Sequence, residues 1–413
     1  MVACNVLWNN VVFAGTLGHT SGNRLPRIVP LRVSAIDTQF DRLILFASHP
    51  RGGSERNMIV VIPSNRAVNL DFLRPLIDSG ARFVVVDDSE GTIQLNHPQF
   101  RVFTWKDRRR MLGALDVAIP RSNGACRDLG FLIAWHEMDN HEIVVALDDD
   151  CVVEDPHFPE EVARVLETGP SVTLEAATPF FNVLDVYEGI DTPMFPRGFP
   201  YSARAGYQRP RFVPAQPRPA KFHLGLWQGD FDINAIDKLH LRQWAFPEAR
   251  LKVASVGVPA GTWVSACSMN MQFRREVIPA VYQLPMRIEV LPPWCIDRYG
   301  DIWGGFILKA LMDVRGDQLS VGGPMIRHLK EGSFEKNMRQ EHLAHLVNDE
   351  FIGLLRAAAA DLQPADYLAM MEHLAEGIAA RVEHCSPILK SYIEHLLPAL
   401  RAWLSVLRMR PAW

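Results

Sequence analysis

Short apolar runs, each ended by polar or turn-forming residues, alternate with amphipathic stretches between residues 58 and 150. MIVVIP, ARFVVVDD, RVFTW and EIVVALDDD have the apolar, β-branched character of short buried strands. NLDFLRPLIDSG and RDLGFLIAWHEMD have helical spacing, and Gly80 is a stop signal for the first of them. Strands that alternate with helices predict a doubly wound α/β layer, which binds ligands at the carboxyl ends of its strands.

The composition of the chain varies along its length, and this variation predicts how the chain is organised. Residues 1–56 mix apolar fragments with Gly, Pro and Arg, and we interpret them as a flexible arm or an upstream extension of the reading frame. Residues 57–330 are predicted to form the catalytic domain. Within it, the irregular, Pro-rich stretch from about 155 to 300 is expected to cover the substrate side of the sheet. Residues 331–413 are rich in Ala, Leu, Glu and His at helical spacing, which predicts a C-terminal helical region.

Composition excludes several classes of protein. The 413 residues carry 43 Lys and Arg against 47 Asp and Glu, a net charge of −4, so no charge excess indicates nucleic acid or an anionic membrane as partner. No apolar run of about 18 residues predicts a membrane span. The six cysteines are scattered without a C-x-x-C pair, which favours a cytoplasmic chain with reduced thiols, although the apolar N-terminus weakly resembles an export signal. Dinucleotide-binding, P-loop, zincin and nucleophile-elbow motifs are absent from the sequence.

Three adjacent carboxylates, Asp148, Asp149 and Asp150, follow the strand EIVVAL and are the sharpest chemical feature. Like charges at a strand end repel one another, and a hard divalent cation with oxygen ligands would offset that cost. Such a cation can bridge the phosphates of a nucleotide-sugar and stabilise a departing diphosphate. The alternative is a solvated acidic turn. His328, after GGPMIR, is a candidate further metal ligand, although a lone His is more often structural.

Other polar positions suggest contacts with the nucleotide or the sugar. Asp87 and Asp88 end a strand and could accept from a nucleobase N–H or a ribose hydroxyl, but on these residues alone a capped turn is the preferred interpretation. Arg197 and Arg204 in PRGFPYSAR carry guanidinium forks that suit diphosphate oxygens, unless the segment is an exposed loop. Trp227, Trp294 and Trp303 are core residues by default, or else stacking surfaces for a sugar.

An ordered series of segments resembles one family, the reversibly glycosylated polypeptides, which include the plant UDP-arabinopyranose mutases. The resemblance runs from about Val60 to the C-terminus. It is carried by ACRDLGF, ALDDDCVVEDP, TPFFN, RGFPYSAR, GLW, PAGTWVSACSMNMQFRRE and IDRYGDIWGGFILK.

The resemblance implies a GT-A-like α/β fold with a mixed, mostly parallel sheet and a helical C-terminal region. It also implies Mn²⁺ or Mg²⁺ on the Asp triplet with His328, no flavin, a UDP- or GDP-linked sugar as substrate, and oligomerisation as in the family. The catalytic residues that it implies are Arg197, Arg204 and Asp301. The nucleotide- or sugar-binding residues are Pro63, Ser64, Asn65, Asp87, Asp88, Arg127, Trp227, Asn270, Trp303 and Lys330.

Differences between this sequence and the plant motifs bear on the identity of the substrate. Gly300 stands at the first Asp of a Tyr-Asp-Asp-Met-Trp motif, Phe199 at a Tyr and Ser268 at a Gly, and one extra residue precedes GLW beside His223. The base and the sugar therefore stay open, and a GDP-sugar such as fucose or galactose is an alternative to UDP-arabinose. Family members become glycosylated on an arginine, yet a guanidinium with a pKa above about 12 is a poor nucleophile.

Three functions compete at this point. The first is a metal-dependent, flavin-independent mutase that interconverts the pyranose and furanose forms of a nucleotide-sugar. The second is a glycosyltransferase of the same fold, which passes the sugar to an acceptor. The third is a non-catalytic partner subunit, against which the intact Asp triplet and the two arginines argue.

Overall fold

The computed structural model describes residues 58–89, 91–139, 141–190, 194–329 and 333–409. The predicted N-terminal arm, residues 1–56, lies outside the described residues. The described residues all belong to one unit, which spans residues 49–411. Within them, no helix combines the length and the apolar character needed to cross a bilayer.

The N-terminal half of the central sheet is parallel, as the apolar runs predict. β1 (Met58–Ser64) lies between β2 (Arg82–Asp87) and β4 (Ile143–Leu147), and β3 (Phe100–Thr104) forms the edge beside β2. Helices α1 (Arg74–Asp78), α2 (Trp105–Leu112) and α3 (Asp128–Glu137) connect these strands. α3 packs on β1 and β2, and Ile59, Val60 and Val61 of β1 have no exposed surface.

The sheet continues through strands from the middle of the chain, which the sequence did not predict. Its order is β3-β2-β1-β4-β13-β9-β16-β11-β6-β8. β9 (Ala220–Asp230) and β16 (Gln318–His328) are long parallel neighbours in its centre, and β13 (Asn270–Arg274) runs antiparallel between β9 and β4. The expectation that residues 155–300 are irregular loop is therefore wrong in part. The remaining strands of the path are β6 (Val172–Glu175), β8 (Arg211–Pro214) and β11 (Ser255–Val258).

Glycines explain why β9 is hard to recognise from its sequence. AKFHLGLWQGD lacks a regular alternation and contains Gly225, which normally weakens a strand. In the structure a Cβ at position 225 would overlap the side-chain amide of Asn270 on the adjacent β13. The glycine thus permits a close approach between two central strands, which no local pattern reveals.

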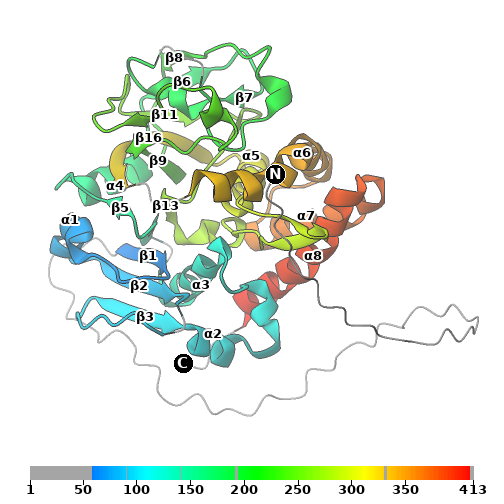
Figure 1. Cartoon of the computed structure of the whole chain (residues 1–413). Helices are drawn as coiled ribbons and strands as arrows, with labels where there is room; N and C mark the ends of the chain where they lie inside the picture. Colours follow the sequence, from blue (N-terminus) through cyan, green and yellow to red (C-terminus); the bar gives the residue numbers. More distant parts are fainter. Residues whose placement is uncertain (1–57, 90, 140, 191–193, 330–332, 410–413) are drawn as a thin grey trace, which may run out of the picture. The chain divides into compact units, whose positions relative to one another are not determined.

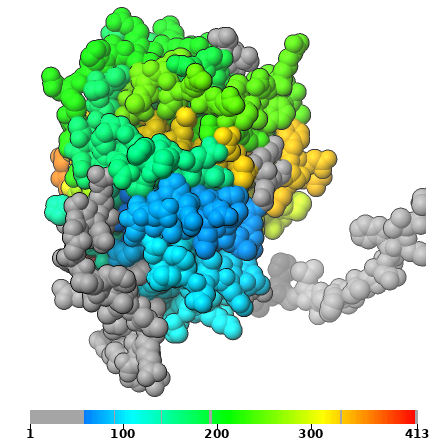
Figure 2. All heavy atoms as spheres, turned by 90° about the vertical axis from the view of Figure 1, so that its left-hand side faces the viewer, coloured from blue at the N-terminus to red at the C-terminus, as the bar shows by residue number. Residues whose placement is uncertain are grey.

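Short strands and a crossover helix complete the sheet region. α4 (Phe158–Glu167) connects β5 (Cys151–Val152) with β6 and packs on β9 and β16. The other pairs are β7 (Phe180–Phe181) with β12 (Trp263–Val264), β10 (Ala245–Phe246) with β9, and β14 (Ile288–Leu291) with β15 (Trp294–Ile296). In Figure 2 the blue N-terminal strands lie below the green middle segment on one face of the molecule.

The C-terminal helices are part of the same packed unit. α5 (Gly300–Arg315) precedes β16, and α6 (Phe334–Ala359), α7 (Tyr367–Ala379) and α8 (Pro387–Arg408) follow it, in orange to red in Figure 1. Side chains at their N-caps accept from the first turn of α6, α7 and α8. Trp303 of α5 stacks on Phe351 of α6 with ring centroids 4.4 Å apart. The predicted α/β class with a mixed sheet and a helical C-terminal region is confirmed.

Candidate functional site

A cavity of about 890 Å³ lies where five strands end. Ser64 ends β1, Asp88 follows β2, Asp148 follows β4, Asp230 ends β9 and His328 ends β16, and all five line the cavity. This is the edge at which an open α/β sheet normally binds its ligand. The cavity therefore lies where the sequence predicted the ligand site.

Each carboxylate of the Asp triplet faces a different cationic side chain. Asp148 accepts from the buried Arg127, and Asp149 accepts from Arg66, with Nη2 to Oδ1 at 2.6 Å and Nε to Oδ2 at 3.1 Å. Asp150 Oδ2 lies 3.7 Å from His328 Nε2. The repulsion expected within the triplet is thus offset by two guanidinium groups and an imidazole.

The ionisation of this region follows from burial and these pairs. Burial raises the pKa of Asp148, and Arg127 opposes that effect. Burial acts to lower the pKa of His328, but the hydrogen bond to Asp150 and the bond that Nδ1 donates to the Asp230 carbonyl raise it to about 9. His328 is therefore an imidazolium at neutral pH in this arrangement.

The predicted metal-binding residues carry donor atoms that suit a divalent cation, but these atoms are not arranged to bind one. Carboxylate oxygens and an imidazole nitrogen are suitable donors for Mn²⁺ or Mg²⁺. Among the described residues, however, no three His, Cys, Asp or Glu side chains are grouped so that they could hold a metal ion. Asp148 and Asp149 point their oxygens at arginines instead. The arrangement does not fit a bound metal, so we derive no chemical step through one.

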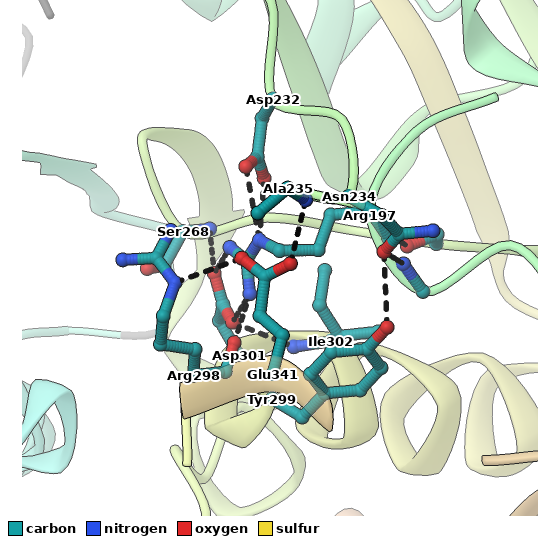
Figure 3. A network of polar contacts seen from close by, with 12 residues as sticks. Arg197, Asp232, Asn234, Ala235, Ser268, Arg298, Tyr299, Asp301, Ile302 and Glu341 are labelled. Atoms are coloured by element: carbon teal, nitrogen blue, oxygen red, sulfur yellow. Dashed lines mark hydrogen bonds and ion pairs between the residues drawn. The ribbon is translucent and has the colours of Figure 1, made fainter. Parts of the chain in front are cut away.

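Arg197 is held between two carboxylates in the same cavity, as Figure 3 shows. Its Nε lies 2.9 and 3.2 Å from the two oxygens of Asp232, and its Nη atoms lie 3.0 and 2.8 Å from those of Asp301. Nη1 also donates to the backbone carbonyl of Arg298. The guanidinium thus donates from all three nitrogens, which fixes its plane.

These contacts hold Arg197 and Asp301 in their charged forms. Burial acts to lower the pKa of Arg197, but Asp232 and Asp301 raise it well above its usual value. Burial acts to raise the pKa of Asp301, but Arg197 and the backbone N–H groups of Ser268 and Ile302 lower it overall. A guanidinium that stays protonated has no lone pair to offer, so Arg197 acts here as a fixed positive charge.

Strained backbone is concentrated around the cavity. Within the described part of the chain, three residues other than glycine have positive φ: Ser122 at 50°, Arg287 at 60° and Arg298 at 63°. All three line the cavity. Arg298 donates from Nε to Glu341 at 3.0 Å, and Glu341 also accepts from the backbone N–H of Ala235. Strain held in place by such contacts is typical of functional sites.

Comparisons with known proteins identify the family of this chain. Residues 54–408 match the family described as reversibly glycosylated polypeptide. The chain belongs to this family.

Relatives at modest identity carry mutase names. The chain is 30% identical over 312 residues to a probable UDP-arabinopyranose mutase 1 from Pisum sativum. This alignment covers 72% of this chain and 77% of the relative. It is 29% identical over 310 residues to UDP-arabinopyranose mutase 1 from Arabidopsis thaliana, and that alignment covers 72% of this chain and 78% of the relative. A solved structure of glucosyl-3-phosphoglycerate synthase from Mycobacterium tuberculosis, in complex with Mn²⁺, UDP and phosphoglyceric acid, aligns at 16% identity. That alignment covers 74% of this chain and 85% of the synthase, with a TM-score of 0.34.

The site residues expected of a reversibly glycosylated polypeptide divide into two groups. The first group lines the cavity: Pro63, Ser64, Asn65, Asp88, Arg127, Asp148, Asp149, Asp150, Arg197, Asp301 and His328. The second group lies outside its lining: Asp87, Arg204, Trp227, Asn270 and Trp303. Lys330 lies outside the described residues.

Members of the second group have structural partners. Asp87 accepts from the backbone N–H groups of Ser89 and Ile93 and so shapes its own loop. Arg204 pairs with both oxygens of Asp237 and lies over the Tyr201 ring at 3.8 Å. Trp227 and Asn270 are buried between strands, and Trp303 is buried against the C-terminal helices. These contacts favour the core or capped-turn alternatives for Asp87 and the two tryptophans.

Several residues of the site were missed from the sequence. Arg66 pairs with Asp149, Lys238 pairs with Asp230 at 2.8 Å, and Asp232 pairs with Arg197. Asp230 and Asp232 follow the strand AKFHLGLWQG as Asp148 and Asp150 follow IVVAL. Had β9 been recognised as a strand, the same argument would have found them.

Proposed function

We propose that this chain is a flavin-free mutase that interconverts the pyranose and furanose forms of a UDP- or GDP-linked sugar. The observation that carries the proposal is Arg197, fixed between Asp232 and Asp301 in a cavity at the strand ends. The identity of about 30% to UDP-arabinopyranose mutases supports the same reaction class. The base and the sugar stay open within the proposal.

The nucleoside would occupy the ends of β1 and β2. Ser64, Asn65 and Asp88 line this end of the cavity, and the backbone N–H of Asp88 donates to the Ser64 carbonyl at 2.9 Å. Asp88 accepts from the backbone N–H groups of Ser122 and Asn123, while burial raises its pKa. A carboxylate fixed in this way presents an acceptor to a nucleobase N–H, a donor that both uracil and guanine have.

The diphosphate and the sugar would lie between the Asp triplet and the Arg197 network. His328 and Lys238 are cations on this side of the cavity, and negative charge on a departing diphosphate would be stabilised there. Arg197 and its carboxylates would surround the sugar carbon at which the bond to phosphate breaks. Because Arg197 stays protonated between two carboxylates, we assign it an electrostatic role rather than that of a covalent nucleophile.

We include dependence on Mn²⁺ or Mg²⁺ in the proposal because of the family resemblance. When bound, such a cation would supply charge for the departing diphosphate. The side chains of the triplet would then have to leave the partners described above, which an assay with and without chelator tests directly.

A ring-size assay tests the proposed function. The purified chain with Mn²⁺ is incubated with UDP-arabinopyranose and, separately, with GDP-fucose or GDP-galactose, and the anomeric signals are followed by NMR. We expect a new furanose signal with one of these substrates, and a parallel incubation with EDTA shows whether the signal depends on the cation. If every substrate stays in the pyranose form while the protein is folded and binds nucleotide, the mutase proposal is overturned.

Further cations in the cavity support the transferase as second candidate. Arg287, Arg298 and Lys336 also line it and could bind a second substrate. An acceptor could enter there. Release of free nucleotide without a furanose signal, stimulated by an added acceptor, would favour this reaction over the mutase.

A further inference from the structure

We propose that Asp232 is the group that carries the proton during the ring change, an inference that rests on the proposed mutase reaction. Asp232 follows β9 and lines the cavity, with 13% of its side chain exposed. It lies in direct contact with Arg197, whose Nε is within 3.2 Å of both its oxygens. It is thus a carboxylate that a substrate can reach and that the fold holds in place.

Asp232 has acceptor capacity that its neighbours lack. Among the described residues, the donor to its carboxylate is Arg197 Nε alone. Asp301 already accepts from two Nη atoms of Arg197 and from the N–H groups of Ser268 and Ile302. A carboxylate offers about four acceptor positions, so Asp301 is saturated and Asp232 keeps positions open.

Other carboxylates of the cavity have partners of their own. Asp149 binds Arg66 and Ser64, and Asp148 binds Arg127. Asp297 accepts from Gln340 and from the backbone N–H of Arg298, and it lies 3.5 Å from Arg287. Of the two carboxylates that hold Arg197, Asp232 is therefore the one with open acceptor positions.

The ring change requires a base and then an acid. In the first step the sugar O4 attacks C1 while the C1–O bond to the diphosphate breaks. The diphosphate takes the electron pair of that bond, and the O4 proton passes to Asp232. In the second step a diphosphate oxygen attacks C1 while the C1–O5 bond breaks, and O5 takes that electron pair and the proton from Asp232. Bonds, charges and the proton balance, and the nucleotide-sugar is regenerated as a furanose.

One carboxylate can serve both steps. In the bicyclic acetal between them, O4 and O5 are both bonded to C1, so a group within hydrogen-bond reach of one oxygen lies close to the other. Arg197 beside Asp232 supplies a fixed positive charge that holds the carboxylate in place as it gains and returns the proton. The same argument applies to a pentose or a 6-deoxyhexose, because both form furanose rings through O4.

Asp232→Asn tests the role, since it keeps the shape and removes the basic oxygen. We expect the single-turnover rate of furanose formation to fall about 100-fold or more, the usual contribution of a general base. We expect the dissociation constant of the nucleotide-sugar to stay within about threefold, because nucleotide contacts lie elsewhere. As a matched control, Asp313→Asn removes the carboxylate partner of the buried Lys309 outside the cavity and should leave the rate unchanged.

Chemical rescue separates proton transfer from simple charge balance. In Asp232→Ala, formate should restore turnover in a concentration-dependent way, whereas chloride, an anion of the same charge without useful basicity, should not. If chloride rescues as well as formate, Arg197 only needs a counter-ion and the inference is overturned. A wild-type rate retained within tenfold by Asp232→Asn would overturn it too. The absence of furanose with the wild-type protein would instead refute the proposed function.

Discussion

Arg197 and Asp301 are 104 residues apart in the chain, yet the two Nη atoms of Arg197 lie 3.0 and 2.8 Å from the two carboxylate oxygens of Asp301. Arg197 precedes a short turn of helix, and Asp301 lies in the first turn of α5. The pair joins the middle segment of the chain to the helix that precedes β16. It therefore serves both the architecture and the candidate chemistry.

Replacing Arg197 by Ala should impair both stability and activity. The substitution leaves the carboxylates of Asp232 and Asp301 buried without their cation, and breaking a buried pair costs about 3–5 kcal/mol of unfolding free energy. We expect a loss of furanose formation and a lower unfolding free energy, measured by the ring-size assay and by denaturant unfolding. Arg381→Ala, which removes an exposed pair with Asp361, is the control and should change stability by less than about 1 kcal/mol. Mutase activity retained by Arg197→Ala would refute its electrostatic role.

Asp128 should make the protein less stable as the pH rises above about 4. Burial raises the pKa of this fully buried carboxyl well above its usual range, and its Oδ2 has no hydrogen-bond partner among the described residues. The folded state therefore keeps a proton that the unfolded chain loses near its ordinary pKa of about 3.9, so stability falls between that pH and the higher folded pKa. Asp128→Asn lacks this loss and should gain stability relative to wild type between pH 4 and pH 7. Urea unfolding at both pH values measures the difference, and a constant difference would contradict the prediction.

Arg66 should compete with a divalent cation for the Asp triplet. Its guanidinium binds both oxygens of Asp149 and lies 3.8 Å from Asp150, and about a third of the side chain is exposed. Because a partly exposed ion pair contributes up to about 1 kcal/mol, Arg66→Ala should bind Mn²⁺ about fivefold more tightly. Electron paramagnetic resonance of free Mn²⁺ measures this without reference to turnover. Weaker binding in the variant would show that Arg66 supports the metal site instead.

Trp303 should hold helices α6 and α8 against α5. Its ring is fully buried, stacks on Phe351 and meets the edge of Tyr392 in α8 at 5.0 Å. Trp303→Ala should therefore cost about 3–5 kcal/mol of unfolding free energy. Trp294→Ala is the matched control, because that ring is 46% exposed and its loss should cost little. Equal losses in the two variants would contradict the packing described here.

The local sequence pattern predicted correctly those segments whose secondary structure follows from their own hydrophobic periodicity. The apolar runs of β1, β2 and β4 and the helical spacing of α3 were predicted from the sequence, and so was the position of the Asp triplet at a strand end. It failed for β9, whose glycines and mixed polarity make sense only beside Asn270 and β16. With β9 unrecognised, Asp230 and Asp232 could not be placed at the same edge of the sheet.

The sequence by itself determined the α/β class, the family and the position of the Asp triplet at the strand ends where the cavity lies. Periodicity and ordered motifs are local properties, and burial of parallel strands follows from them. Only the tertiary structure decided that Arg197 is held by Asp232 and Asp301, that Arg66 faces Asp149, and that Arg204 pairs with Asp237 away from the cavity. The physical reason is that the partner of a charged side chain is chosen by packing between segments tens to about a hundred residues apart. Each isolated segment is equally compatible with a solvated charge.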